Sequence, residues 1–331
     1  MWKRTVWACG LLLAMTLSLH AQGTDIAKLF PDSTEMAFSF NVKSLLGSSF
    51  FQKHFKEDFD KQITNNAQLQ KLMETIGFDL RKDVTSVTFT VSKFIAKLGG
   101  QPDWDGFAVV KGAFNVEKMT GALGALIAAA NQADKVTTSK FGDYLIYEVK
   151  DSNSGKTFYG TIFDKETIFG GTTKDDVTNA IERSLGRKAA SLNTRFADLM
   201  SKARNNNTMW GALVIPASIR EMSKMSPNPE MGDAISKLES QTMNLNIKDD
   251  IKFDVSMYMT EDAAATQLKT LMDQAKEMAG AFALSNEQFG SELADLVSSL
   301  QVGANGKKVS FSGDIKAELL DKLVKVMKDR K

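Results

Sequence analysis

The sequence predicts an α+β fold made of two similar units, each a mainly antiparallel sheet covered by helices. Strand-like alternation and helix-like periodicity follow one another along the chain, and no low-complexity tract interrupts them. The same order of strands and helices recurs in the second half, which indicates an internal duplication. With 331 residues, the chain is long enough to bury one or two cores.

The first 23 residues predict an export signal. Lys3 and Arg4 precede an apolar stretch that ends at Leu19 and is too short to span a bilayer comfortably. Small side chains permit cleavage after Ala21 or after Gly23, and an uncleaved anchor or a buried helix is the alternative. We therefore expect an exported protein, periplasmic or extracellular, with no transmembrane span after cleavage.

The first unit is predicted over residues 24–190. Alternation in "MAFSFNV" predicts a strand at 36–42, and an apolar face at 69–76 predicts a helix that Gly77 ends. Turn sequences such as "FGD" then separate short strands. The other expected elements are strands at 87–91 and 107–114, a helix capped by Asn115, and strands at 136–140, 144–149, 158–163 and 167–169.

The stretch "IFGGTTKDDV" places two glycines where a phosphate-binding loop would lie. It contains neither GxxxxGK followed by Ser or Thr nor GxGxxG. Asp175 and Asp176 put negative charge at the helix start, where a bound anion would have to lie. Thr173 and Asp176 instead resemble a capping box in which aspartate replaces glutamate, so the stretch predicts a tight strand-to-helix turn.

The second unit, predicted over 191–331, repeats the first in order. "WGALVIPASI" corresponds to "AFSFNVKSL", because each is a strand that enters a helix. The strand and long helix from Phe253 correspond to those from Phe107, and the strand, glycine and helix from Lys307 correspond to those from Glu166. Three matches in the same order predict a duplicated unit.

The second unit also contains the clearest strand pattern. Apolar residues alternate over 243–247 and again over 251–259, with a "KDD" turn between them, which predicts an antiparallel hairpin with one apolar face. Two apolar stripes at helical spacing follow, over 268–282 and 289–300. These stripes predict two helices that either cover the sheet or pair as a hairpin.

Composition excludes several classes of chemistry. Cys9 is the single cysteine and lies in the predicted signal, so the mature chain has no thiol for disulfides, nucleophilic catalysis or zinc thiolates. His54 is the single histidine after the signal, and its phenylalanine neighbours favour a place at the edge of a core. Loss of Lys3 and Arg4 leaves 39 basic residues against 40 acidic ones, and no basic stripe predicts a nucleic-acid partner.

Two motifs are weaker hints of metal binding. Met222, Met225 and Met231 carry soft thioethers that suit Cu(I), but methionine also fills cores and adaptable surfaces. "DSNSGK" at 151–156 begins like a calcium loop and lacks the carboxylate that would close it, so a turn explains it better. We assign no metal ligand and no cofactor-binding residue.

The acidic residues define no catalytic pair. Adjacent carboxylates such as Asp249 and Asp250 usually diverge, and no nucleophile elbow, zinc-binding helix or kinase signature is present. Trp104 with Asp103 and Asp105 suggests a carbohydrate site, although an aromatic residue at a loop edge is more often a packing lid. We assign no catalytic residue.

The chain resembles uncharacterised exported bacterial proteins. The resemblance lies in a signal peptide followed by "LFPDSTEMAFSFNVKSLL", "GFDLRKDVTSV", "VVKGAFNVEKM" and "IFGGTTKDDV". It covers most of the mature first half and, more loosely, the second. It implies a duplicated α+β fold and an exported location, without an assigned activity.

The function expected from these observations is binding without catalysis. An envelope protein that binds a protein partner or an apolar ligand would use adaptable surfaces of Met, Phe and Ala. The alternative is an envelope hydrolase that uses Asp or Glu carboxylates from distant positions of the chain.

Overall fold

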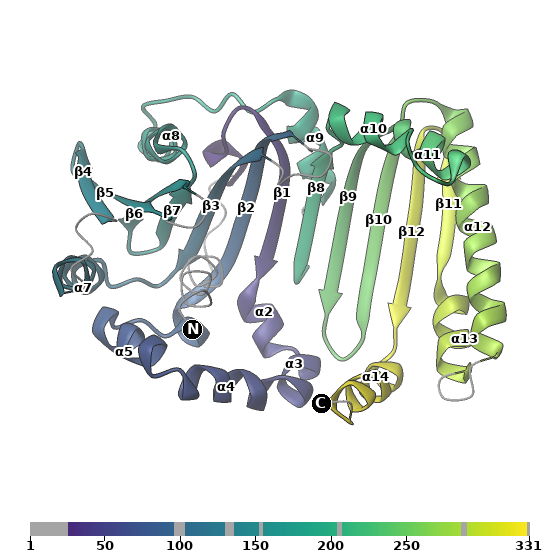
Figure 1. Ribbon diagram of the computed structural model, residues 1–331, viewed down its shortest axis with the longest axis horizontal. Helices are drawn as coiled ribbons and strands as arrows, with labels where there is room; N and C mark the ends of the chain where they lie inside the picture. The colour runs from purple at the N-terminus through teal and green to yellow at the C-terminus, as the bar shows by residue number, and fades with distance from the viewer. Residues whose placement is uncertain are drawn as a thin grey trace. The chain divides into compact units, whose positions relative to one another are not determined.

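The computed structural model describes residues 26–95, 103–129, 136–151, 155–203, 207–285 and 290–329. The predicted signal and Cys9 lie outside the described residues. The chain divides into two compact units, whose strands and helices are labelled in Figure 1. Unit 1 contains described residues from 26–46, 57–94 and 103–197, and unit 2 contains those from 47–56 and 198–329.

Unit 1 contains seven described strands in the order β1-β2-β3-β7-β6-β5-β4. Strand β1 pairs antiparallel with β2, and β3 pairs antiparallel with β7. The pairs β7 with β6, β6 with β5 and β5 with β4 are also antiparallel. The strands are β1 (Thr34–Asn41), β2 (Val84–Ile95), β3 (Asp103–Gly112), β4 (Val136–Phe141), β5 (Tyr144–Lys150), β6 (Thr157–Asp164) and β7 (Thr167–Gly171).

Unit 2 repeats this order with five described strands, β8-β9-β10-β12-β11. Its strands match β1, β2, β3, β7 and β6 in sequence order and in sheet order, so the predicted duplication is confirmed. Unit 1 differs by the additional hairpin of β4 and β5. The unit 2 strands are β8 (Met209–Val214), β9 (Leu238–Ile247), β10 (Ile251–Met259), β11 (Gln301–Asn305) and β12 (Lys308–Ile315).

Helices connect the strands in both units. Those with residues in unit 1 are η2 (Ile26–Leu29), α2 (Val42–Gly47), α4 (Lys56–Asn65), α5 (Ala67–Ile76), α6 (Leu80–Asp83), α7 (Val116–Ala129), α8 (Lys174–Ser184) and α9 (Thr194–Ala203). Those of unit 2 are α3 (Ser49–His54), α10 (Ala217–Ser223), α11 (Pro229–Ser236), α12 (Asp262–Leu284), α13 (Gly290–Ser299) and α14 (Ala317–Asp329).

The predicted helix boundaries follow from local chemistry. Gly77 has φ of 68° and ends α5 in the left-handed conformation that favours glycine. The amide of Lys118 donates to Asn115 Oδ1 at 2.9 Å at the start of α7. The amide of Asp176 donates to Thr173 Oγ1 at 3.2 Å, so "IFGGTTKDDV" is the predicted strand-to-helix turn.

Two strands of unit 1 differ from their predicted bounds. β2 runs from Val84 to Ile95 where 87–91 was predicted, and β3 begins at Asp103 where 107 was predicted. Lys93 Nζ on β2 lies 3.2 Å from Asp105 Oδ2 on β3, and the ring of Phe89 lies 5.9 Å from that of Trp104. These contacts between side chains explain why the ladder continues beyond the apolar run.

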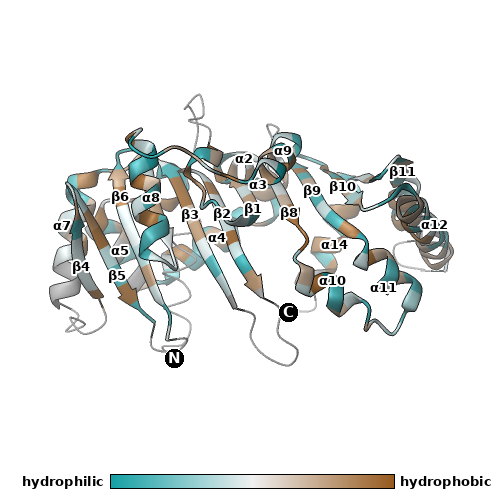
Figure 2. Ribbon diagram, turned by 90° about the horizontal axis from the view of Figure 1, so that it is seen from above, coloured by the Kyte–Doolittle hydropathy of each residue, from teal (hydrophilic) through white to brown (hydrophobic). Residues whose placement is uncertain are grey.

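The sheet of unit 1 buries apolar residues on both faces. Val110 and Ile168 face α7 in one core cluster, whereas Phe107 and Phe169 point to the opposite face and are fully buried. Helix α8 packs on β6 and β7, and its Ile181 is also fully buried. The alternation that sorts these side chains appears as brown and teal bands along the strands in Figure 2.

The core of unit 2 lies at one end of its sheet. Met259 and Val309 on the strands are buried against Ala234 of α11 and Ala264 and Leu268 of α12. Helix α12 contacts β10, β11 and β12 and also pairs with α13, so the two predicted helices both cover the sheet and form a hairpin.

Candidate functional site

One face of the unit 2 sheet carries apolar side chains in register across three strands. Val255 on β10 lies opposite Met243 on β9 and opposite Phe311 on β12. Directly opposite residues of antiparallel strands point to the same face. We call this surface the apolar strand face and define it by Met243, Leu245, Phe253, Val255, Met257 and Phe311.

The apolar strand face is only partly covered by protein. All six of its side chains are partly exposed, whereas Met259 and Val309, farther along the same face, are 1% and 0% exposed. The rings of Phe253 and Phe311 lie 5.3 Å apart and contact each other within the surface. Helices α11 and α12 therefore close one end of this face and leave the remainder partly exposed.

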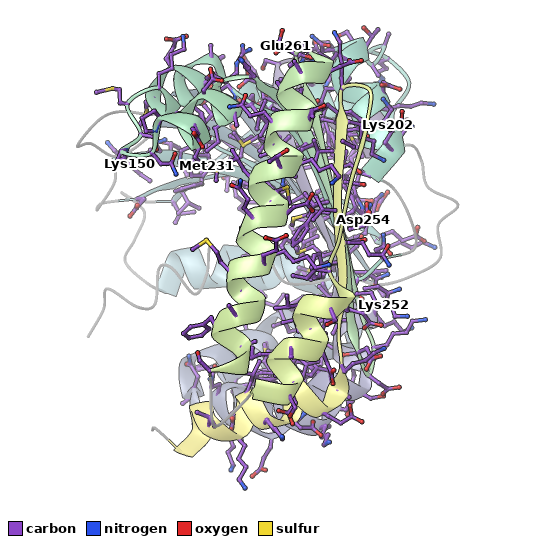
Figure 3. All side chains as sticks on the ribbon, turned by 90° about the vertical axis from the view of Figure 1, so that its right-hand side faces the viewer. Lys150, Lys202, Met231, Lys252, Asp254 and Glu261 are labelled. Atoms are coloured by element: carbon purple, nitrogen blue, oxygen red, sulfur yellow. The ribbon has the colours of Figure 1, made fainter. Side chains whose placement is uncertain are left out.

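The opposite face of the same sheet is polar and is covered at some positions but exposed at others, such as Lys252 and Asp254. Ala212, Thr242 and Ser256 share it and are 0%, 2% and 4% exposed. Lys202 Nζ of α9 lies 5.1 Å from the ring centre of Tyr258, which places the end of α9 on this side. Figure 3 shows Asp254 and Lys252 on the side of the sheet opposite to Met231.

This sheet departs at several positions from the usual burial of an antiparallel sheet. Such a sheet normally packs its apolar face on a core and exposes its polar face to water. Here small polar residues are buried, and a row of Met, Leu, Val and Phe stays partly in contact with solvent. A row of this kind binds apolar groups well, because thioether and aromatic side chains adapt to irregular partners.

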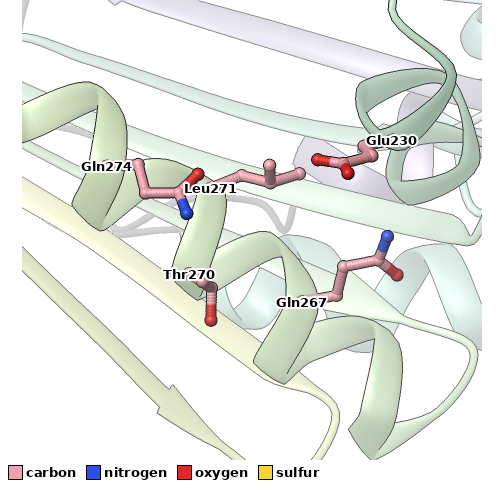
Figure 4. Close-up of a pocket in the computed structure, with 5 residues that line it drawn as sticks. All are labelled: Glu230, Gln267, Thr270, Leu271 and Gln274. Carbon is pink, nitrogen blue, oxygen red and sulfur yellow. The ribbon is translucent and has the colours of Figure 1, made fainter. Parts of the chain in front are cut away.

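A small concavity lies between α11 and α12, with a volume of about 280 Å³ (Figure 4). It is lined by Glu230, Gln267, Thr270, Leu271 and Gln274. One carboxylate among amide and hydroxyl groups offers hydrogen bonds to a polar ligand or to water. The lining contains a single ionisable residue, so it supplies no acid and base pair.

The predicted carboxylate pair at the start of α8 diverges. Asp175 is exposed, whereas Asp176 is half-buried. Burial raises the pKa of Asp176, the negative charge of Asp105 raises it further, and the hydrogen bond from Thr173 lowers it. Asp176 thus lies in the first turn of α8, and the carboxylate of Asp105 is close enough to affect its pKa.

The Trp104 side chain packs against an aromatic ring and a lysine ammonium group. Its ring meets Phe89 edge-on, and Lys156 Nζ lies 5.0 Å from the ring centre. Lys156 Nζ also donates to the carbonyl oxygen of Trp104 at 3.1 Å, and a Cβ on Gly106 would lie 2.4 Å from the indole. These contacts make Trp104 a packing residue, while the side chain of Asp103 lies outside the described residues.

His54 lies at the edge of a core, as its phenylalanine neighbours predict. Its Nε2 is 2.6 Å from Asp321 Oδ1, and its ring centre is 5.3 Å from that of Phe50. Lys53 Nζ donates to Asp321 Oδ2 at 2.5 Å, and these bonds hold the pKa of Asp321 below its usual value. The cluster fastens α14 to α3, with the side chain of His54 only 11% exposed.

The second predicted acidic pair has a structural role. Asp250 Oδ1 accepts a hydrogen bond at 2.9 Å from the amide of Ala317 at the start of α14, and Asp250 Oδ2 accepts one from Lys316. Asp249 beside it is exposed. Asp250 therefore anchors α14, and the two carboxylates do not act together.

The two predicted metal motifs differ in how far the structure describes them. Met225 and Met222 are 69% and 38% exposed, and Met231 is partly buried. Residues 152–154 of "DSNSGK" lie outside the described residues. Within the described ranges, no group of three or more His, Cys, Asp or Glu side chains is placed to hold a metal ion.

The described chain is thus a duplicated α+β protein, and its comparisons with known proteins add little. No family model matches the chain, and no curated protein matches it. A solved structure of TP0453 aligns with 93% of this chain and 99% of its own, at 11% sequence identity and a TM-score of 0.49. Among the described helices, none is both long enough and apolar enough to cross a membrane.

Proposed function

We propose that this protein is exported to the bacterial envelope and binds a protein partner or an apolar ligand without catalysing a reaction. The apolar strand face of unit 2 is the binding surface. The observation that supports this function is the row of apolar side chains on that sheet face, which the helices of unit 2 leave partly exposed. The predicted signal and the resemblance to exported bacterial proteins support the location.

A bound apolar group would remove the remaining exposed area of this face from water. Each square ångström of apolar surface buried contributes about 25 cal/mol to binding. Methionine and phenylalanine side chains fit ligands of different shape, which suits a class of apolar ligands better than a single polar metabolite. The same surface would accept an apolar segment of a protein partner.

The first test measures binding of the fluorescent apolar probe N-phenyl-1-naphthylamine to the mature protein. Val255→Thr keeps the shape of the side chain and adds a hydroxyl group to the centre of the surface. We expect it to weaken probe binding about fivefold, because the added hydroxyl group reduces the binding free energy of the apolar contact by about 1 kcal/mol. Asp254→Asn is the matched control, because its side chain lies on the opposite face of the same strand.

Equal probe affinity in Val255→Thr and Asp254→Asn would remove the apolar strand face as the binding surface. Native mass spectrometry of mature protein taken gently from producing cells then identifies what is bound. Extra mass that disappears on denaturation, and that Val255→Thr reduces, would define the natural ligand as a small molecule or a protein.

A hydrolase is the second candidate, and the surroundings of Asp176 favour it. A half-buried carboxyl group with a raised pKa keeps its proton to higher pH than usual and can act as an acid when a second carboxylate lies nearby. Asp105 supplies that second group. Release of product from a panel of nitrophenyl glycosides and esters, lost in Asp176→Asn and in Asp105→Asn, would favour this function over binding alone.

A further inference from the structure

Helix α12 carries apolar residues at the alternating spacing of a coiled-coil seam. The helix has 23 residues, and its seam residues follow one another at intervals of three, four, three and four positions. This spacing keeps one stripe of a helix turned toward a neighbouring helix. We call this stripe the α12 seam, formed by Leu268, Leu271, Ala275, Met278 and Phe282.

The first part of the α12 seam is packed and the second part is not. Leu268 is 7% exposed within the unit 2 core, whereas Met278 and Phe282 are 74% and 66% exposed. Helix α13 covers a different side of α12, because Gly280 approaches Val297 and Lys276 Nζ donates to the carbonyl oxygen of Leu300. The exposed half of the seam therefore has no neighbour among the described residues.

The sides of the α12 seam carry no charge. In a coiled coil, the flanking positions are usually charged and select the partner helix. On α12 these positions hold glutamine, methionine or alanine, and the charged residues lie on the other side of the helix. The flanking residues are Gln267, Met272, Gln274, Ala279 and Ala281. An identical helix can approach this side without repulsion between like charges.

The exposed seam is also complementary to itself in size. An antiparallel copy related by a two-fold axis between Met278 and Ala279 would place Phe282 on Ala275 of the second copy. The same axis would place Met278 on Ala279 of the second copy. Each large side chain then meets a small one, as close packing requires, and both copies use the same surface.

We propose that the protein associates with a second copy of itself through the exposed half of the α12 seam, in antiparallel orientation. The contact is short, so the dimer belongs to the class of small interfaces that form and dissociate with concentration. This inference does not rest on the proposed function, because the α12 seam and the apolar strand face share no residue. Variants of one surface therefore test it without altering the other.

The test introduces single cysteines into the mature chain. The native Cys9 precedes the predicted cleavage site, and it is replaced by serine if the signal is not removed. Ala279→Cys lies beside the proposed axis and is expected to form a disulfide dimer. Glu277→Cys on the charged side is the control. Association raises the local thiol concentration, so Ala279→Cys should cross-link at least about tenfold faster than Glu277→Cys.

Mixed samples test the orientation. Ala275→Cys mixed with Phe282→Cys should give the mixed disulfide faster than either variant cross-links with itself. Faster self-linking of each variant would indicate a parallel pair and overturn the antiparallel arrangement. Equal rates for Ala279→Cys and Glu277→Cys would overturn the contact itself.

Sedimentation velocity tests the association without cross-linking. Ala279→Leu should shift the protein to monomer, because leucine suits an exposed helix and would collide with Met278 of the second copy. Met278→Glu should have the same effect through burial of a charge. A wild-type protein that stays monomeric at the highest soluble concentration, or a dimer that survives both variants with unchanged affinity, would overturn the proposal.

Discussion

Units 1 and 2 share one strand order and differ in which sheet face is closed. In unit 1, Phe107 and Phe169 lie under α8 and are fully buried, and a second core covers the other face. In unit 2, α14 packs on α3 and α13, and the apolar strand face stays partly exposed. A duplicated topology therefore does not impose a duplicated surface.

The helix that follows the third strand shows the same divergence. Helix α7 has 14 residues and contributes Met119 and Ala122 to the unit 1 core. Its counterpart α12 has 23 residues, and only its first part is buried in the unit 2 core. Met119 and Ala122 of α7 belong to the unit 1 core, whereas Met278 and Phe282 of α12 stay exposed.

The largest test of this difference removes one phenylalanine from each unit. Phe107→Ala leaves a cavity in a closed core and should destabilise unit 1 by about 3–5 kcal/mol. Phe253→Ala removes a partly exposed side chain and should cost less than about half of that. Calorimetry and amide hydrogen exchange, which reports on each unit separately, provide the two values.

The comparison fails if the two phenylalanine variants lose equal stability. In that case, the apolar strand face would contribute to the core of unit 2 as strongly as the buried face contributes to that of unit 1. Apolar probe binding gives an independent reading, because it should fall in Phe253→Ala and stay unchanged in folded Phe107→Ala.

A smaller effect is expected where α14 is fastened. Asp321→Asn removes the charge that binds Lys53 and His54. Because the pKa of Asp321 is lowered in the folded protein, its stabilisation is full above the unfolded pKa and is lost as the pH falls through the folded value. The pair is partly exposed, so the loss at pH 7 should be about 1 kcal/mol or less.

Hydrogen exchange of α14 at pH 7 and at pH 3 measures this effect. Exchange should be faster in Asp321→Asn than in wild type at pH 7, and the difference should be smaller at pH 3, below the unfolded pKa of aspartate. Lys325→Gln, an exposed change on the same helix, is the control. A difference that persists unchanged at pH 3 would contradict an electrostatic origin.

Much of the fold could be predicted from the sequence because it depends on local patterns. Contacts between residues far apart in the sequence could not be predicted. Alternation predicted the strands of both units, and Thr173 predicted the start of α8. The contact of His54 with Asp321 joins residues 267 positions apart, and no local pattern indicates it. The exposure of the apolar strand face was equally hidden, because alternation shows that a face is apolar without showing whether a helix covers it.

The smallest expected effect concerns Asp176 in unit 1 and has the opposite sign to that of Asp321. Burial raises the pKa of Asp176, so the folded protein holds this proton more tightly than the unfolded chain and loses stability as the pH rises through the raised value. Asp176→Asn removes this loss. The variant should therefore match or slightly exceed the wild-type melting temperature at pH 7.

A variant of the α8 cap distinguishes the effect of the Asp176 charge on stability from the effect of the helix cap. Thr173 Oγ1 accepts from the backbone amide of residue 176, a bond that Asp176→Asn leaves intact. Thr173→Ala should instead cost about 1 kcal/mol through loss of the helix cap. If Asp176→Asn destabilises unit 1 at pH 7 as much as Thr173→Ala, the ionised carboxylate stabilises the helix start, and burial is not what governs its pKa.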